Sequence, residues 1–215
     1  MAALPIAVKD PPQPHGDANA FLPLIFLWVS AFNSQLTNAG QGARTEAAMI
    51  LGMSLATFTQ FHVIISLIGI LSGIVVLLGM LNAKLLPSAT TLFLITTVAS
   101  CLTGFMFPIP FDPPAAIGCL TLALLALAII ALYYYKLSES WRGVYVISSV
   151  IALYFNCFVL VVQTFQKVGF FHALAPTQKE PPFAAAQAVL LLVFIGLGIA
   201  AFKRFRPSAH APAAA

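Results

Sequence analysis

Charged residues are scarce in this sequence. Only 7% of its 215 residues are Asp, Glu, Lys or Arg, whereas soluble domains average about 25%. Hydrophobic residues make up 60% of the chain, and the mean hydropathy is +0.98. The apolar runs are continuous and lack the alternation of a barrel strand, which leaves helices as the spanning structure. The composition therefore predicts an all-α integral membrane protein.

Sequence signatures of catalysis are lacking as well. The chain has no GxSxG elbow, no HExxH motif and no glycine-rich phosphate loop. No pair of carboxylates falls inside an apolar run, although intramembrane proteolysis and proton-driven transport usually need ionisable groups there. We therefore expect no catalytic residues and no enzymatic activity.

Cysteine is also rare, and its spacing is uninformative for metals. The three cysteines, Cys101, Cys119 and Cys157, lie in apolar runs without a CxxC pair. This pattern gives neither a disulfide framework nor a zinc site, so we expect free thiols that behave as small apolar residues, with no metal and no cofactor. The basic residues are spread over loops and the tail, which favours the lipid bilayer and not nucleic acid as their partner.

Five uncharged windows predict five transmembrane crossings. A crossing needs about 20 apolar residues to span a hydrocarbon core of about 30 Å. We place the crossings of this polytopic helix bundle at about 61–82, 90–109, 114–135, 143–166 and 183–202. Prolines mark the joints between them, and Tyr133 to Tyr135 with Trp141 indicate an aromatic belt at one interface.

The remaining segments divide the chain into four parts. Residues 1–20 are rich in proline and alanine and predict a flexible tail. Residues 21–33 are apolar but too short to span comfortably, so an interfacial or re-entrant segment is predicted, with a sixth short crossing as the alternative. That segment and a polar linker occupy residues 21–55. The transmembrane bundle occupies residues 56–206, and a second flexible tail occupies residues 207–215.

The basic residues predict the orientation. With five crossings, one side receives six of them and the other side four, and the richer side is cytoplasmic by the positive-inside bias. The N-terminus is then outside and the C-terminus cytoplasmic. The richer side carries Lys84, Lys136, Arg142, Lys203, Arg204 and Arg206.

Small residues indicate where the helices pack. Ser66, Gly69 and Gly73 share one face of the first crossing, and the two glycines form a GxxxG pair. Substitution of either glycine by leucine is expected to be more damaging than the same change at Gly79. Small and polar residues recur at helical spacing on the second crossing, from Thr96 to Gly104, and on the fourth, from Ser149 to Gln163. We expect these three faces to meet. Asn156 lies near the middle of the fourth crossing and is expected to face the bundle, because an amide in lipid needs a hydrogen-bond partner.

His62 is the one histidine on a predicted crossing, near its outer end. Other polar residues collect on the same side, so a small-molecule site is predicted at the outer mouth of the bundle. Since His62 shares a face with Ser66, Gly69 and Gly73, its ring should point inward, near Gln163 or the last loop. The candidate polar site comprises His62, Gln60, Asn156, Gln163, His172 and Glu180.

Four stretches of the sequence carry a resemblance. They run from Phe61 to Gly73, Thr103 to Pro108, Ile151 to Phe165 and Leu174 to Phe183. Over about residues 55–207, this pattern resembles a group of small bacterial integral membrane proteins without assigned function. The resemblance implies a bacterial inner-membrane location and supplies no activity, cofactor or substrate.

Three functional interpretations follow. The first is a small binding or accessory protein, with a membrane-protein partner or a second copy of the chain. The second is a redox protein that holds haem or quinone at the outer face, although a bundle haem usually takes two axial ligands and the other histidines lie off the crossings. The third is a subunit of a small transporter or channel.

Overall fold

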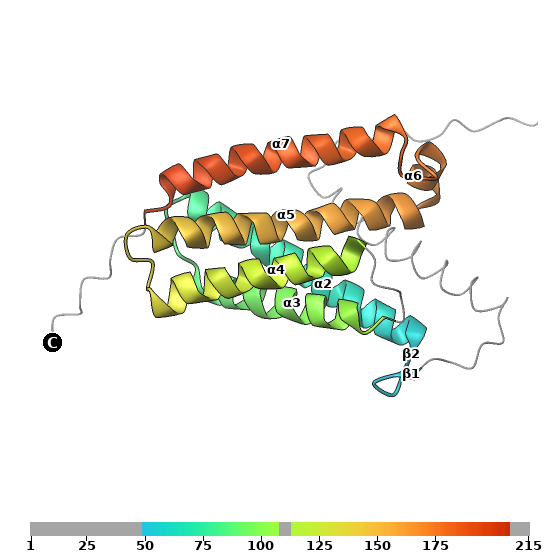
Figure 1. Cartoon of the computed structure of the whole chain (residues 1–215), viewed down its shortest axis with the longest axis horizontal. Helices are drawn as coiled ribbons and strands as arrows, with labels where there is room; N and C mark the ends of the chain where they lie inside the picture. Colours follow the sequence, from blue (N-terminus) through green and yellow to red (C-terminus); the bar gives the residue numbers. More distant parts are fainter. Residues whose placement is uncertain (1–48, 108–112, 207–215) are drawn as a thin grey trace, which may run out of the picture.

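The computed structural model describes residues 49–107 and 113–206. Within them, five long helices run along the long axis of the molecule (Figure 1). These are α2 (Leu55–Leu81), α3 (Pro87–Phe105), α4 (Pro113–Ile129), α5 (Trp141–Lys167) and α7 (Pro181–Arg204). The predicted all-α bundle of five crossings is confirmed. The tails 1–20 and 207–215 and the apolar segment 21–33 lie outside the described residues.

Three short elements complete the fold. A π-helical turn, η1 (Ile130–Tyr134), extends α4, and a one-and-a-half-turn helix, α6 (Gly169–Leu174), lies between α5 and α7. A hairpin of two-residue strands, β1 (Met49–Ile50) and β2 (Met53–Ser54), precedes α2. The linker predicted up to residue 55 therefore contains local structure, and the last loop contains a helix that its length did not indicate.

The first helix begins six residues earlier than the sequence predicted. Ser54 is its N-cap, and the Ser54 side chain accepts a hydrogen bond from the Thr57 backbone N–H at 3.2 Å. Such a cap satisfies one of the N–H groups that a helix start leaves without an intrahelical partner. The apolar run alone marks the membrane-embedded part, so it misses the turn and a half that includes Thr57 and Gln60.

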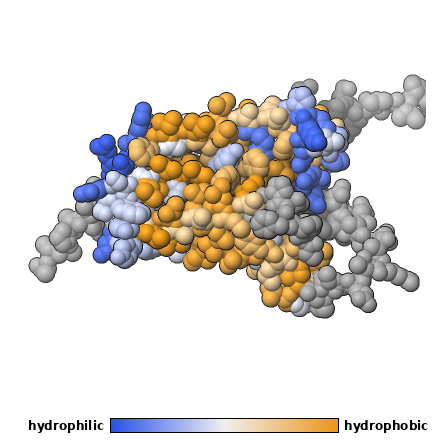
Figure 2. Space-filling model, viewed as in Figure 1, coloured by the Kyte–Doolittle hydropathy of each residue, from blue (hydrophilic) through white to orange (hydrophobic). Residues whose placement is uncertain are grey.

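The outer surface of the bundle is apolar along most of its length. Figure 2 shows a hydrophobic band over the middle of the molecule and hydrophilic residues at both ends. Ile95 on α3 and Leu192 on α7 are 62% and 68% exposed. All five long helices are long and apolar enough to cross a membrane. The chain is therefore a multi-pass membrane protein whose exposed apolar side chains face lipid.

Helices α2 and α5 are central in the bundle. Helix α5 contacts α2, α4, α6 and α7, whereas α2 contacts α3, α5 and α7. Among the spanning segments, α2 and α5 have the largest buried share, and α7 lies on the outside. Phe93 of α3 and Leu153 of α5 are nearly fully buried between these helices.

The glycines of α2 allow the close approach of its neighbours. A Cβ atom on Gly73 would lie 2.6 Å from Leu153 Cδ1 and 2.9 Å from the Phe93 ring, and one on Gly69 would lie 3.2 Å from Thr97 Oγ1. A Cβ on Gly79 would also lie 2.9 Å from Leu86 Cδ1. A side chain at Gly79 would therefore also meet a neighbour, although leucine was expected to be better tolerated there than at Gly69 or Gly73.

We expect Gly73→Leu to lower the free energy of unfolding in detergent by about 1–3 kcal/mol, because the added side chain forces Leu153 and Phe93 apart. Gly196 of α7 is the matched control. A Cβ there meets nothing within 4 Å, so Gly196→Leu should change stability by about 0.5 kcal/mol or less. Thermal unfolding of both variants measures the difference, and equal losses would contradict a close contact at Gly73.

Candidate functional site at the His62 end

His62 lies on α2 and contacts the end of α3. Its Nδ1 is 2.8 Å from Thr103 Oγ1. The ring packs edge-on against Phe107, with centroids 5.3 Å apart and an interplanar angle of 83°. Gly104 leaves space beside it, since a Cβ there would lie 3.6 Å from His62 Cε1. We call this end of the bundle, with the start of α2 and the ends of α3 and α5, the His62 end.

The hydrogen bonds of Thr103 determine which ring nitrogen carries the proton. The Thr103 hydroxyl donates to the Ala99 carbonyl at 2.7 Å, with Ser100 O at 3.1 Å as a second acceptor. A threonine hydroxyl has a single hydrogen, so toward His62 it acts as an acceptor. This arrangement favours the neutral tautomer with the proton on Nδ1 and the lone pair on Nε2. Across the described residues no hydrogen bond is made by Nε2.

Polar contacts continue from His62 along the α2–α3 interface. The Ser66 hydroxyl donates to the His62 carbonyl at 2.8 Å and pairs with Ser100 Oγ at 2.6 Å. One turn further into the bundle, Gly69 lies against the hydroxyls of Thr96 and Thr97. The face predicted from Ser66, Gly69 and Gly73 is thus the face of α2 that packs on α3.

Asn156 joins α5 to the same face of α3. Its Nδ2 donates to Thr97 Oγ1 at 3.3 Å. This bond satisfies a donor inside the apolar part of the bundle, where water is not at hand. Asn156 is therefore an interhelical contact, and it lies about three turns before the end of α5 at Lys167, so it does not reach the mouth.

The last loop and α7 are tied to α5 by two glutamines. Gln178 Nε2 donates to the Val162 carbonyl at 3.0 Å, and Gln187 Nε2 donates to the Phe158 carbonyl at 3.4 Å. Phe158 and Val162 are one turn apart, so both amides donate to the same face of α5. Neither glutamine belongs to the predicted site, although an amide in an otherwise apolar run is a signal that could have identified Gln187.

Glu180 closes the loop before α7. Its Oε1 accepts hydrogen bonds from the Thr177 hydroxyl at 2.8 Å and the Thr177 N–H at 3.2 Å, and Oε2 accepts from the Lys179 N–H at 3.0 Å. The hydrogen bond from Thr177 lowers the pKa of this carboxyl below its ordinary value. The carboxylate form thus stabilises the loop at neutral pH, and this contribution is lost as the pH falls through the lowered pKa.

The hydrogen bonds of His62, Asn156 and Glu180 go to three different threonines, Thr103, Thr97 and Thr177. The described contacts of the His62 ring are to α3 and to Phe107, and none is to Gln163 or to the last loop. His172 is exposed on α6, and Gln60 is exposed on α2. In residues 49–107 and 113–206, no group of three or more His, Cys, Asp or Glu is arranged to hold a metal ion. The three cysteines are free thiols.

We expect His62 to be in the Nδ1–H form in lipid at mildly alkaline pH, as read from the 15N chemical shifts of its ring. Thr103→Val removes the acceptor, so the population of the Nε2–H form should rise. Thr103→Ser keeps the hydroxyl and should preserve the wild-type spectrum. A wild-type ring with its proton mainly on Nε2 would contradict the assignment.

No family model, curated protein or solved structure matches the chain. The resemblance to small bacterial membrane proteins accordingly stays a prediction.

Proposed function

We propose that the chain is a small binding or accessory protein of a bacterial inner membrane, and that it acts through the His62 end and not as an enzyme. The observation that carries the proposal is the fixed ring of His62. Its Nδ1 lies 2.8 Å from Thr103 Oγ1, and the Thr103 hydroxyl donates to the Ala99 carbonyl, which favours the proton on Nδ1. Nε2 then presents a lone pair, and a ligand or partner group with an N–H or O–H can donate to it.

The surroundings of His62 support a binding role. The ring is half-buried and edge-on to Phe107, and Phe107 packs in turn on Phe58 with centroids 5.2 Å apart. An acceptor beside apolar rings is a common arrangement for a small organic ligand, because the rings supply contact area and the polar atom fixes orientation. The ligand class that fits is an amphipathic molecule with a hydrogen-bond donor.

The charge distribution supports an orientation with this end outside. Six basic side chains lie at the opposite end of the spanning helices, on the loops after α2 and η1, at the start of α5 and at the end of α7. The positive-inside bias makes that end cytoplasmic. A reporter fused after Arg206 should then be cytoplasmic, and a periplasmic signal would reverse the orientation.

A haem- or quinone-binding redox protein is the second candidate, because the Nε2 lone pair of His62 is also the group that ligates iron or accepts a hydrogen bond from a quinol. A Soret band in the purified protein would favour haem; we expect none.

A transporter subunit is the third candidate and has less support. A polar pathway along the hydroxyls of α3 would be interrupted at Phe93, which is 1% exposed and packed against the Gly73 position.

Carbethoxylation of histidine tests the binding role. The unprotonated ring nitrogen attacks a carbonyl carbon of diethyl pyrocarbonate and displaces ethyl carbonate, so the occupancy of Nε2 determines the rate at His62. We expect His62 to react several-fold more slowly in native membranes than in purified protein returned to vesicles of synthetic phosphatidylethanolamine and phosphatidylglycerol. Exposed His172 is the internal standard, measured in the same digest by mass spectrometry. An unchanged ratio of His62 to His172 modification would contradict occupancy of the site.

A further inference from the structure

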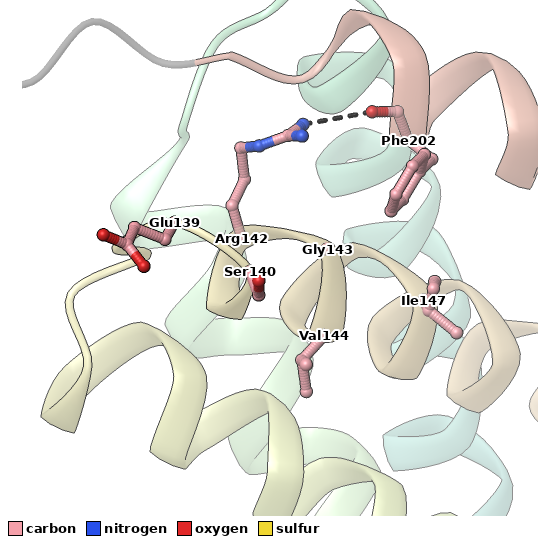
Figure 3. Close-up of a pocket in the computed structure, with 7 residues that line it drawn as sticks. All are labelled: Glu139, Ser140, Arg142, Gly143, Val144, Ile147 and Phe202. Carbon is pink, nitrogen blue, oxygen red and sulfur yellow. Dashed lines mark hydrogen bonds between the residues drawn. The ribbon is translucent and has the colours of Figure 1, made fainter.

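A hollow lies at the opposite end of the bundle, between the start of α5 and the end of α7. Its volume is about 440 Å³. Figure 3 shows Arg142, Gly143 and Ile147 of α5 along one side and the Phe202 ring of α7 facing them. We propose that this hollow, the α5–α7 groove, binds an anionic phospholipid, with the phosphate at Arg142 and an acyl chain along the apolar side chains beyond it.

The polar rim of the groove suits a phosphate. Arg142 Nη1 donates to the Phe202 carbonyl at 3.0 Å and to the Phe205 carbonyl, which holds the guanidinium at the end of α7. Figure 3 shows the side chain extended along the rim of the groove toward Phe202. A guanidinium has five N–H donors, and both described bonds use Nη1. The remaining donors match the oxygens of a phosphate, which arginine often binds through two of them.

The electrostatics of this end favour an anionic ligand. Six basic side chains and one acidic one, Glu139, lie on the loops and helix ends there. Glu139 lines the groove, but Figure 3 shows its carboxylate directed away from the Arg142 guanidinium. Lys203 and Arg204 are exposed on the last turn of α7, directly after Phe202. The local charge therefore attracts phosphate headgroups, as expected for a basic cluster at a membrane surface.

The apolar side of the groove suits an acyl chain. Ile147 is the fifth residue after Arg142, which places it about 7–8 Å deeper along α5. Ile147 is 50% exposed, and Phe202, which lines the groove from α7, is 42% exposed. A lipid with its phosphate at Arg142 would thus lay its chain over side chains that already face the hydrocarbon region. The groove is polar at its rim and apolar deeper in the bundle, which matches the headgroup and the acyl chain of a phospholipid.

Quenching of tryptophan fluorescence by brominated lipids can test this proposal. The chain has two tryptophans, Trp28 and Trp141, and Trp141 is the residue before Arg142. In full-length protein with Trp28→Phe, Trp141 reports lipids near the groove. Brominated phosphatidylglycerol in phosphatidylcholine vesicles, and the reverse mixture, give the relative affinity for the two headgroups. We expect a preference for phosphatidylglycerol of roughly fivefold or more, the factor that one basic residue contributes near an anionic surface.

Two pairs of variants separate the groove from the general attraction of a basic surface. Ile147→Phe fills the groove without altering charge, so the preference for phosphatidylglycerol should fall close to one. Ile95→Phe, at an exposed position of α3, should leave this preference unchanged. Arg142→Gln should reduce the preference by a larger factor than Lys203→Gln, which removes the same charge outside the groove. The melting temperature of each variant shows whether Arg142→Gln unfolds the end of α7. If it does, Ile147→Phe still decides the question, because it leaves the Arg142 contact in place.

Three results would overturn the proposal. The first is an unchanged preference in Ile147→Phe, which would assign the selectivity to surface charge alone. The second is equal affinity for both headgroups in the parent protein. The third is a change of oligomeric state in Ile147→Phe nanodiscs, measured by mass, which would show that a second copy of the chain covers the groove.

Discussion

The bundle depends on one constraint, that polar groups inside lipid must find partners within the protein. Helix α3 meets it by presenting hydroxyls to two neighbours. Ser100 pairs with Ser66 of α2, and Thr97 accepts from Asn156 of α5. The close approach that these short bonds need is possible because Gly69 and Gly73 of α2 lack side chains at the contact. Hydrogen bonding and small residues thus act together, and the apolar side chains remain for lipid.

The two ends of the bundle then differ in chemistry. At the His62 end, hydrogen bonds fix the ring so that an unprotonated nitrogen is presented beside Phe107. At the other end, Arg142 anchors the last turn of α7 to the start of α5, and basic side chains surround the groove between them. We propose a neutral hydrogen-bond donor as the ligand of the first end and a phosphate as the ligand of the second. Both depend on side chains held at the junction of two helices.

Sequence patterns predicted the architecture better than the site. Five apolar windows were enough to predict five crossings, because the length of an apolar run directly reflects the thickness of the bilayer. The face of α2 with Ser66, Gly69 and Gly73 was also identified, since helical spacing places these residues in one row. The contact of this face with the second and fourth crossings was also expected, and the Ser66–Ser100 and Asn156–Thr97 hydrogen bonds confirm it. His62 was expected near Gln163 or the last loop, and its hydrogen bond goes to Thr103 of α3. Hydropathy is nearly uniform around α2 and α3, so it does not specify the individual partner of a side chain. The α6 helix and the η1 turn were also missed. Neither element changes the apolar pattern from which the crossings were predicted.

The coupling between Thr97 and Asn156 tests the central constraint most directly. A double-mutant cycle with Thr97→Val and Asn156→Leu, measured by reversible unfolding in lipid bicelles, isolates the contribution of the pair. The account predicts a favourable coupling of about 0.5–2 kcal/mol, the range found for hydrogen bonds between membrane helices. Strictly additive effects of the two substitutions would contradict it, and would show that packing alone holds α3 against α5.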